Sequence, residues 1–576
     1  MKKLRFLCSV LETSLVTVYL LGTLVHPASA AIIPVSSAAE ISTAMSSAQP
    51  GDTLLMQEGT WLNQHISFVG NGTELDPIVL RAETVGSVVL TGTSTLRISG
   101  EWLVVDSLVF NEGYTFSSPV IEFRATSMSP ARHCRLTNTV IRNYNPSEIS
   151  TGYKWVSLYG QYNRVDHCYF TGKTNSGALL VVWMDEEPDY HRIDHNRFAE
   201  RPPLGANGAE IIRIGTSDWS MYDSNCVVED NLFQQCNGEI EIISNKSCEN
   251  IYRRNTFRAC SGTLTLRHGN RCSVYQNFFL GDNEPNSGGV RIIGEDHRVY
   301  NNYFENLEGQ NYYSAISLVN AVPNSPLNRY FQVKRALVVN NTVVNCAHSL
   351  TIGAGADEEE KTLPPLDCII ANNVVYHEDP CQFLIEYKSE PNNLFYLGNI
   401  MYGVGLEVNE PESGILWQDP CLIPTDSLWR PAATSPLLDA VQSVFAFITE
   451  DRDGHLRCGL IEQSVFDAIT EDMNDFHCGL FDQSVFNFTT EDTNDFCCGL
   501  LFGQSVFDVI AEDMNGFLRC GLFTQSILDF IAEDVDGHIR SGLFDVGADE
   551  WLDEPITNVP LTPDDVGPEI TAPRGR

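Results

Sequence analysis

The sequence E-D-N-L-F at 229–233 returns as R-R-N-T-F at 253–257 and as Y-Q-N-F-F at 275–279. Each copy holds a polar residue, usually Asn, then one variable residue and an aromatic or branched residue. Further copies stand at Asn138, Cys168, Asn196, Asn302, Asn341, Asn373 and Asn399. The shortest interval is 22 residues, and the longer intervals vary up to 39. A minimum interval with variable excess is typical of a coil of constant girth that carries loops.

This repeat predicts an all-β fold, a right-handed parallel β-helix over residues 31–425. The strands are short and show no helical period, and a recurring Asn at one corner can satisfy turn backbone groups from rung to rung. A β-propeller would show a period of about 40 residues with four strands per repeat, which does not fit. Before the coil, Ser37–Ala48 has small and apolar residues at helical spacing. We expect a short helix there that caps the open end of the coil.

The first 30 residues have the pattern of a secretory signal. Lys2 and Lys3 make a basic start, Ser14–Val25 is mostly apolar, and Ala28-Ser29-Ala30 is a small-residue cleavage site. No later stretch is long and apolar enough to suggest a membrane span. The sequence therefore predicts a secreted or periplasmic protein.

A second repeat occupies the C-terminal region, residues 426–551. Five copies of about 21 residues begin at Gln442, Gln463, Gln483, Gln504 and Gln525. Each copy holds an apolar stretch, an acidic pair and a turn, so a duplicated surface segment is the simplest interpretation. Residues 552–576 are polar and Pro-rich, which predicts a disordered tail.

The composition limits the class of partner. The formal charge is −39, which argues against nucleic acid because phosphate binding needs a basic face. The cationic side chains are nevertheless gathered in one segment, at Lys246, Arg253, Arg254, Arg258, Arg267, Arg271 and Arg291. Such a cluster can bind a polyanion, although scattered surface arginines are the alternative. The 17 cysteines include no C-x-x-C pair, so most are expected to be small buried core residues.

Candidate site residues lie inside this cationic segment. Glu239 and Glu241 are two apart in an alternating run, so on one strand they share a face. Lys246 and Arg267 are 21 residues apart, close to one minimal turn of the coil. The spacing predicts one face on which successive rungs carry Asn207, Glu239 with Glu241, Arg267 and Arg291.

Those residue types suit a particular chemistry. One amide and two carboxylates are oxygen ligands for a hard cation such as Ca²⁺, although a surface Glu pair could also simply balance arginines. Nearby cations disfavour the protonated form of Lys246, which makes it a candidate general base. Arg267 can stabilise an anion or shield a leaving oxygen, and His268 could carry a proton or be merely structural. Cation, base and arginine together fit β-elimination of a uronate polysaccharide.

The same residues resemble polysaccharide lyase family 6, the alginate lyases and chondroitinase B. The matching motifs are N-G-A-E-I-I-R-I-G at 207–215, E-I-E-I-I-S-N-K-S at 239–247 and L-R-H-G-N at 266–270. P-G-D-T-L-L-M-Q-E-G-T-W at 50–61 and P-I-V-L-R-A-E at 77–83 are also similar to the family. The repeats after residue 442 depart from it.

The resemblance implies a fold, a cofactor and residue roles. It implies a right-handed parallel β-helix, Ca²⁺ held by Asn207, Glu239 and Glu241, Lys246 as base and Arg267 as acid or its assistant. It implies Arg213 and His268 as substrate-binding residues, and the spacing of the rungs adds Arg291 as a third. The expected activity is an exported lyase acting on alginate. The alternatives are a lyase acting on dermatan sulfate and a non-catalytic β-helix that binds acidic glycans.

Overall fold

The computed structural model describes residues 30–380, 383–404, 413–425, 427–438, 440 and 559–568, together with five short strands between residues 449 and 523. These five strands are β46 (Thr449–Glu450), β47 (Leu456–Arg457), β48 (Gly499–Gly503), β49 (Val506–Glu512) and β50 (Leu518–Phe523). Nearly all of the predicted signal sequence and most of the predicted C-terminal repeats lie outside the described residues. None of the helices in the described part of the chain is long and apolar enough for a membrane span.

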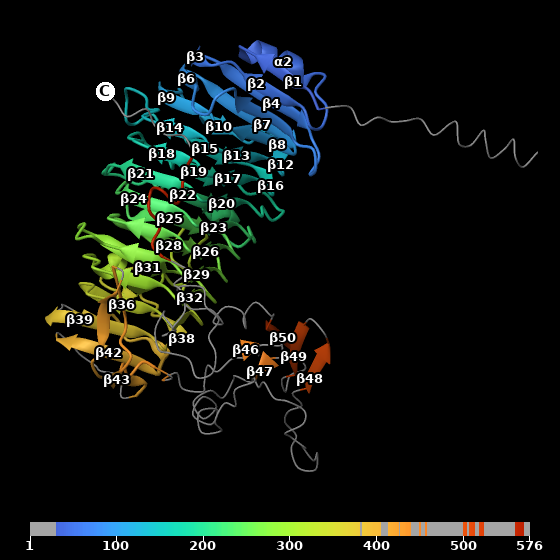
Figure 1. The fold of residues 1–576 in the computed structure, drawn as a ribbon. Helices are drawn as coiled ribbons and strands as arrows, with labels where there is room; N and C mark the ends of the chain where they lie inside the picture. Colours follow the sequence, from blue (N-terminus) through green and yellow to red (C-terminus); the bar gives the residue numbers. More distant parts are fainter. Residues whose placement is uncertain are drawn as a thin grey trace, which may run out of the picture.

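The chain winds into a coil of three long parallel sheets, which confirms the predicted parallel β-helix (Figure 1). Sheet A has 14 strands and runs from β1 (Ile32–Val35) to β41 (Asn392–Leu397). Sheet B also has 14 strands and runs from β3 (Gly59–Leu62) to β43 (Ile415–Trp417). Each turn visits sheet A, then B, then C, so residues one turn apart become neighbours on adjacent rungs.

Sheet C carries the candidate site. Its 15 strands are β4 (His65–Asn71), β7 (Thr95–Glu101), β10 (Ile121–Glu122), β11 (Arg124–Thr126), β12 (Ser129–Arg132), β15 (Val156–Leu158), β16 (Gly160–Gln161), β19 (Leu180–Val182), β22 (Ile212–Gly215), β25 (Glu241–Lys246), β28 (Gly262–His268), β31 (Ser287–Ile292), β34 (Ile316–Val319), β37 (His348–Ala354) and β40 (Phe383–Tyr387).

A ladder of buried asparagines runs along one corner of the coil, as predicted. The side-chain amide of Asn231 donates to Oδ1 of Asn255, and that of Asn255 donates to Oδ1 of Asn277, both at 3.0 Å. The same pattern continues to Asn399. Asn138 is an exception: Val140 pairs with Tyr169, which places Thr139 rather than Asn138 at the ladder position. The interior beside this corner is a stack of phenylalanine rings, for example Phe233 on Phe257 with centroids 4.6 Å apart.

Helix α2 (Ala38–Met45) covers the N-terminal end of the coil, which confirms the predicted cap (Figure 1). The Ser37 hydroxyl accepts the backbone N–H of Glu40 and so begins the helix. Ile41 is fully buried and packs into the main core. The helix therefore closes an end where unpaired strand backbone and apolar core would otherwise meet water.

After the last rung, the chain turns back over the outside of sheet B. A hairpin of β44 (Leu422–Thr425) and β45 (Leu428–Pro431) joins a second apolar cluster, in which Leu437 packs with Phe278 and Tyr303 of the coil.

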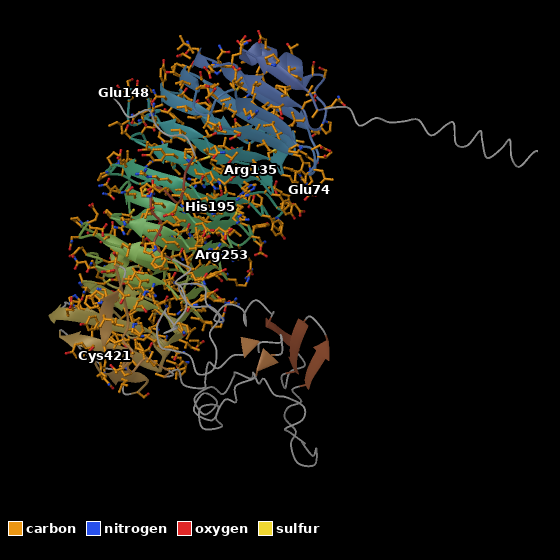
Figure 2. All side chains as sticks on the ribbon, in the orientation of Figure 1. Glu74, Arg135, Glu148, His195, Arg253 and Cys421 are labelled. Carbon is orange, nitrogen blue, oxygen red and sulfur yellow. The ribbon has the colours of Figure 1, made fainter. Side chains whose placement is uncertain are left out.

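Residues 559–568 continue along the same side of the coil. The N–H of Leu561 donates to the Thr256 hydroxyl, and the N–H of Gly567 donates to the carbonyl of His195, both at 2.8 Å. This packed segment differs from the prediction of a disordered tail over 552–576. The cysteines fit the prediction of buried core residues: among those described, all are free and all except Cys421, near the C-terminal end of the coil, are buried (Figure 2).

Candidate active site

The register of sheet C decides which candidate residues face each other. Lys246 pairs with Gly215 on the preceding rung and with His268 on the following rung. The β25–β28 pairing has an irregularity between Asn245 and Lys246, so Arg267 is skipped in the ladder. The prediction that Arg267 is the residue stacked on Lys246 is therefore wrong by one position.

A second irregularity lies at the start of β25, between Glu241 and Ile243. Ile242 and Ile243 are both buried, so the simple alternation expected around the two glutamates is broken. Arg291 pairs with Thr265 rather than with Arg267. The predicted face exists, but Arg213, Ser244, Thr265 and Arg291 form its regular column.

Glu239 lies just before β25 and is held by a turn of the preceding rung. Its Oε1 accepts the backbone N–H groups of Gly208 and Ala209, both at 3.0 Å. Asn207 Oδ1 accepts the same Gly208 N–H at 2.9 Å, so the amide and carboxylate oxygens converge on one donor. Burial, followed by the negative charges of Glu210 and Glu241, raises the pKa of Glu239 to about 7, although the two backbone hydrogen bonds oppose this shift.

Glu210 and Glu241 complete a group of three acidic residues. Glu241 is buried, accepts a hydrogen bond from the Ser244 hydroxyl and has an oxygen 3.5 Å from Nε of Arg267. Glu210 is 3% exposed, and its Oε2 has no hydrogen-bond partner among the described residues. Excess negative charge and a buried unpartnered oxygen fit a cation.

The carboxylates alone do not enclose such a cation. Within the part of the chain that the structure describes, no three His, Cys, Asp or Glu side chains converge closely enough to hold a metal ion by themselves. A hard cation here would need the Asn207 amide and oxygens from water or substrate as well.

Arg267 is fixed by stacking rather than by a full ion pair. Its guanidinium lies 4.1 Å from the centre of the Tyr330 ring, and its Nη1 donates to the carbonyl of Arg329 at 2.8 Å. The Lys361 ammonium lies 3.6 Å from the centre of the same ring. Arg291 donates to the Tyr330 hydroxyl at 3.1 Å. Burial opposes ionisation of Tyr330, but the charges of Arg291, Arg267 and Lys361 outweigh it and lower the pKa of this phenol.

His268 lies beneath the surface and is 1% exposed. Its Nε2 is 3.2 Å from the Ser217 hydroxyl and its Nδ1 is 3.5 Å from Nη1 of Arg267. Burial, followed by the charges of Arg267 and Lys246, lowers the pKa of His268 to about 2. The imidazole is therefore neutral at physiological pH, which does not support the hypothesis that it donates a proton, and it packs against Arg267 instead.

The remaining predicted residues are placed on the same face. Lys246 is half-buried at the end of β25, and its charge acts on His268. Arg213 on β22 lies over the Trp183 ring at 5.1 Å. Arg291 is 3% exposed and lies 4.4 Å from the centre of the Tyr312 ring.

Sequence reasoning missed two residues of this site. Glu210 stands inside the quoted motif at 207–215, and its position three residues after Asn207 is a signal that could have been used. Tyr330 comes from the long connection between β34 and β35 (Leu337–Val339), and no spacing in the sequence points to it. Together the site offers a lysine, an arginine and a carboxylate cluster on neighbouring rungs, which can bind a carboxylate substrate and transfer a proton.

Comparisons with known proteins agree with this geometry. The family model described as Chondroitinase B matches residues 35–435. The solved structure of the PL6 family alginate lyase AlyGC is 39% identical, with a TM-score of 0.67. That match covers 70% of this chain and 55% of AlyGC, so this chain spans about half the length of that relative.

Two further solved structures are similar. A mannuronic acid specific polysaccharide family 6 lyase from human gut microbiota is 34% identical with a TM-score of 0.60, covering 65% of this chain and 86% of its own. The PL6 family polysaccharide lyase Pedsa3628 from Pseudopedobacter saltans is 29% identical with a TM-score of 0.57. That match covers 66% of this chain and 97% of Pedsa3628. No curated protein matches the chain.

Proposed function

Because the chain belongs to polysaccharide lyase family 6, we propose that it cleaves a uronate-containing polysaccharide, alginate first, by β-elimination. The observation that carries the proposal is the meeting of Lys246, Arg267 and the carboxylates of Glu239 and Glu241 on neighbouring rungs of sheet C. The alginate lyase activity of the AlyGC relative supports the choice of substrate.

Lys246 acts as the base in this proposal. In its neutral form it removes the proton at C5 of the uronate, and the electron pair of that C–H bond forms the C4=C5 double bond. The C4–O bond breaks, and its electron pair goes to the leaving oxygen. Arg267, held by Tyr330 and by the Arg329 carbonyl, lies where a fixed positive charge can stabilise the developing anion.

A proton for the leaving oxygen comes from Tyr330 in this proposal. A guanidinium is a poor proton donor, because it stays charged in the working pH range. Tyr330 accepts a hydrogen bond from Arg291, which leaves its own O–H free to donate, and the lowered pKa of the phenol favours that transfer.

Asn207, Glu239 and Glu241 are proposed to hold Ca²⁺, with Glu210 as a further acidic neighbour. A bound Ca²⁺ would neutralise the substrate carboxylate and so make the adjacent C5 proton more acidic. The residues themselves contribute oxygen ligands and a fixed turn at Gly208 that aligns Asn207 with Glu239.

A second substrate candidate is dermatan sulfate, because the matching family model is described as Chondroitinase B. We also propose that the protein is exported, on the basis of the signal pattern in residues 1–30.

The test is the ultraviolet absorbance of the unsaturated uronate that only elimination produces. The full-length protein is mixed with alginate, with dermatan sulfate and with a neutral polysaccharide, each with added Ca²⁺. Absorbance that rises with alginate supports the proposal, and a rise with dermatan sulfate alone replaces alginate by the second candidate. Binding without absorbance change for either polyanion would favour a non-catalytic glycan-binding protein.

A further inference from the structure

Two cationic side chains lie inside the coil, where the chain leaves sheet B for sheet C. Arg201 ends β21 (Arg197–Arg201), and Lys173 follows β18 (Tyr169–Thr171), both of sheet B. Arg201 is 2% exposed and Lys173 is 1% exposed. Lysine and arginine are almost never fully buried unless they are paired, so the partners of these two side chains show what their burial achieves.

Backbone carbonyls accept hydrogen bonds from both cations. Nη2 of Arg201 donates to the carbonyls of Asn175 and Gly177, at 3.3 and 3.0 Å. Nζ of Lys173 donates to the same Asn175 carbonyl at 3.3 Å and to that of Tyr153 at 3.0 Å. The two side chains therefore fasten one loop, the segment around Asn175, from inside the coil.

The loop around Asn175 holds the turn that carries the proposed cation ligands. The Gly177 N–H donates to the carbonyl of Gly208 at 2.7 Å. The Gly208 N–H donates to Oε1 of Glu239 at 3.0 Å. A continuous series of hydrogen bonds therefore links the Arg201 guanidinium to the carboxylate of Glu239.

Arg201 also packs against the residue that precedes Glu239. A Cβ built on Gly238 would lie 2.8 Å from Nε of Arg201 and still closer to the carbonyl oxygen of Ala209. Any larger residue at Gly238 would displace the guanidinium or the turn. The guanidinium, the turn and the start of the Glu239 segment are therefore in close contact.

The charges in this region complement each other. Nη1 of Arg201 and Oε2 of Glu210 are both buried, and neither has a hydrogen-bond partner among the residues that the structure describes. Burial lowers the pKa of Arg201 to about 10, and the negative charges of Glu210 and Glu239 oppose this shift. The guanidinium is therefore charged at neutral pH and offsets part of the repulsion among the carboxylates.

We propose that Arg201 is a positioning residue for the proposed cation site, which it supports through Gly177 and the turn at Gly208. The inference rests on the proposed function, because it takes Asn207 and Glu239 to be cation ligands. It goes further in assigning their alignment to a buried arginine of sheet B that is not itself a ligand. Residues that orient the ligands of a metal set its affinity, so loosening the turn should weaken Ca²⁺ binding without removing a ligand.

The experiment replaces Arg201 by lysine, which keeps the positive charge but loses the planar fork. Arg164→Lys is the matched control, since Arg164 of sheet A also donates through two nitrogens, to the carboxylate of Asp194. Ca²⁺ affinity is measured by calorimetry on the metal-stripped full-length protein. Hydrogen–deuterium exchange of the peptide that contains Gly208 and Ala209 is measured without Ca²⁺.

In Arg201→Lys the Ca²⁺ affinity should fall by about tenfold, the low end for loss of a residue that orients a metal ligand. Exchange of the peptide around Gly208 should become about tenfold faster, because local opening no longer breaks a charge-assisted hydrogen bond. The rate on alginate should recover when Ca²⁺ is raised to saturation, which a general loss of structure would not allow. Arg164→Lys should keep the parent's Ca²⁺ affinity and the parent's exchange of this peptide.

Lys173→Met is the second variant if Arg201→Lys does not fold. Methionine fills a similar space, and replacing a buried charge by an apolar side chain is often tolerated. Because Lys173 fastens the same loop at Asn175, this variant should also weaken Ca²⁺ binding and speed exchange. Each effect should be about threefold, the lower range for one net hydrogen bond.

The inference is overturned if Arg201→Lys, or Lys173→Met in its place, matches Arg164→Lys in either measurement. A parent protein that binds no Ca²⁺ would instead refute the proposed cation site. In that case the exchange measurement alone decides whether Arg201 positions the turn, because it requires no metal.

Discussion

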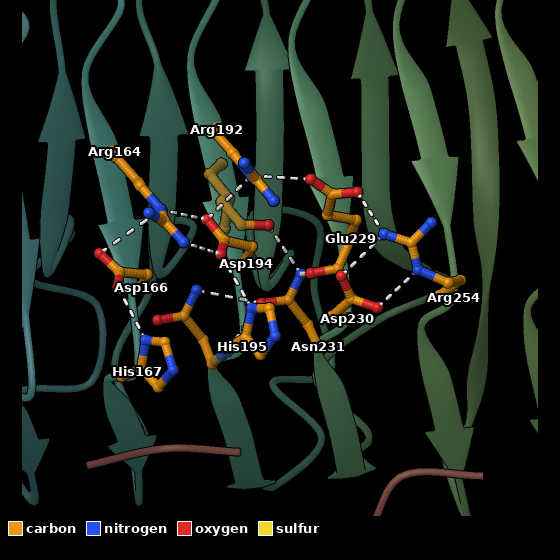
Figure 3. A network of polar contacts seen from close by, with 12 residues as sticks. Arg164, Asp166, His167, Arg192, Asp194, His195, Glu229, Asp230, Asn231 and Arg254 are labelled. Atoms are coloured by element: carbon orange, nitrogen blue, oxygen red, sulfur yellow. Dashed lines mark hydrogen bonds and ion pairs between the residues drawn. The ribbon is translucent and has the colours of Figure 1, made fainter. Parts of the chain in front are cut away.

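Two faces of the same coil use the same residue types in opposite ways. On sheet A, acidic residues on consecutive rungs are matched by arginines: Arg164 binds Asp194 and lies 3.7 Å from Asp166, and Arg254 binds Glu229 (Figure 3). Burial would raise the pKa of Asp194, but hydrogen bonds from His195 and Arg164 lower it to about 2. The charge ladder of sheet A is internally satisfied.

On sheet C, the charges are left incompletely matched. The pKa of Glu239 is raised to about 7. Among the residues that the structure describes, a buried oxygen of Glu210 and the buried Nε atoms of Arg213 and Arg291 have no hydrogen-bond partner. Buried polar groups are normally satisfied, so a cluster of unsatisfied ones indicates that a ligand completes it. The comparison separates charge that stabilises the coil from charge that is available to a substrate.

The largest expected effect concerns the base. Lys246→Arg keeps a positive charge and similar reach, but an arginine does not lose its proton in the working range, so turnover on alginate should fall by about 10²–10⁴-fold. Lys334→Arg is the matched control, because Lys334 only pairs with Glu295 outside the site, and it should retain its rate. A Lys246→Arg rate within about tenfold of the parent would refute the assignment, judged against that range.

Removing one carboxylate from each face should change the free energy of unfolding by different amounts. Asp194→Asn leaves arginines without their buried partner and should lower the free energy of unfolding by about 3 kcal/mol, the low end for a broken buried pair, because those arginines are partly exposed. Glu210→Gln relieves repulsion with Glu239 but also removes a negative charge that acts on the buried Arg201, so the metal-free protein should lose clearly less stability than Asp194→Asn. Denaturant unfolding of both variants measures this difference, and equal losses would remove the distinction between the faces.

Tyr330→Phe tests the proton donor. The ring remains to stack on Arg267, so only the hydroxyl is lost, and kcat should fall by about 10²-fold with a smaller change in KM. Tyr312→Phe is the comparison, since Tyr312 also stacks on an arginine of the site, Arg291, but its hydroxyl is bonded to Glu358 and Lys361. Equal rates for the two variants would leave water as the source of the proton.

The smallest effect concerns pH and Ca²⁺. A carboxyl whose pKa is raised in the folded state stabilises the fold at low pH, and this contribution is lost as pH rises from about 4.5 to about 7. Ca²⁺ competes with that proton, so it should stabilise the protein by about 2 kcal/mol more at pH 8 than at pH 5. Unfolding temperatures with and without Ca²⁺ provide the measurement. In Glu239→Gln the pH dependence of the stabilisation by Ca²⁺ should disappear. If that pH dependence remains, Ca²⁺ does not bind at Glu239.

The fold could be predicted from the sequence because its period is repeated so many times. The intervals from Asn231 to Asn255 and from Asn255 to Asn277 each bring one asparagine next to the following one, and their side-chain amides form the expected ladder. The detailed pairing of Lys246 could not be predicted, because irregularities in the β25–β28 pairing shift the register without altering the motif. Tyr330 could not be found at all, since it reaches the site through tertiary packing of a long loop.

The return of the chain along sheet B has a consequence for the repeats between Gln442 and residue 545. Leu437 belongs to the apolar cluster that includes Phe278 on the outside of sheet B, and the N–H of Leu561 donates to the hydroxyl of Thr256, the partner of Phe278 on the adjacent rung. The repeats therefore lie, in the sequence, between two segments that are both anchored on sheet B. The entropy of closing such a loop grows only with the logarithm of its length, about 0.6 kcal/mol for each doubling. Adding or removing one whole copy would leave both anchors in place at a small cost in loop entropy, so we expect the coil to tolerate a change in the number of copies.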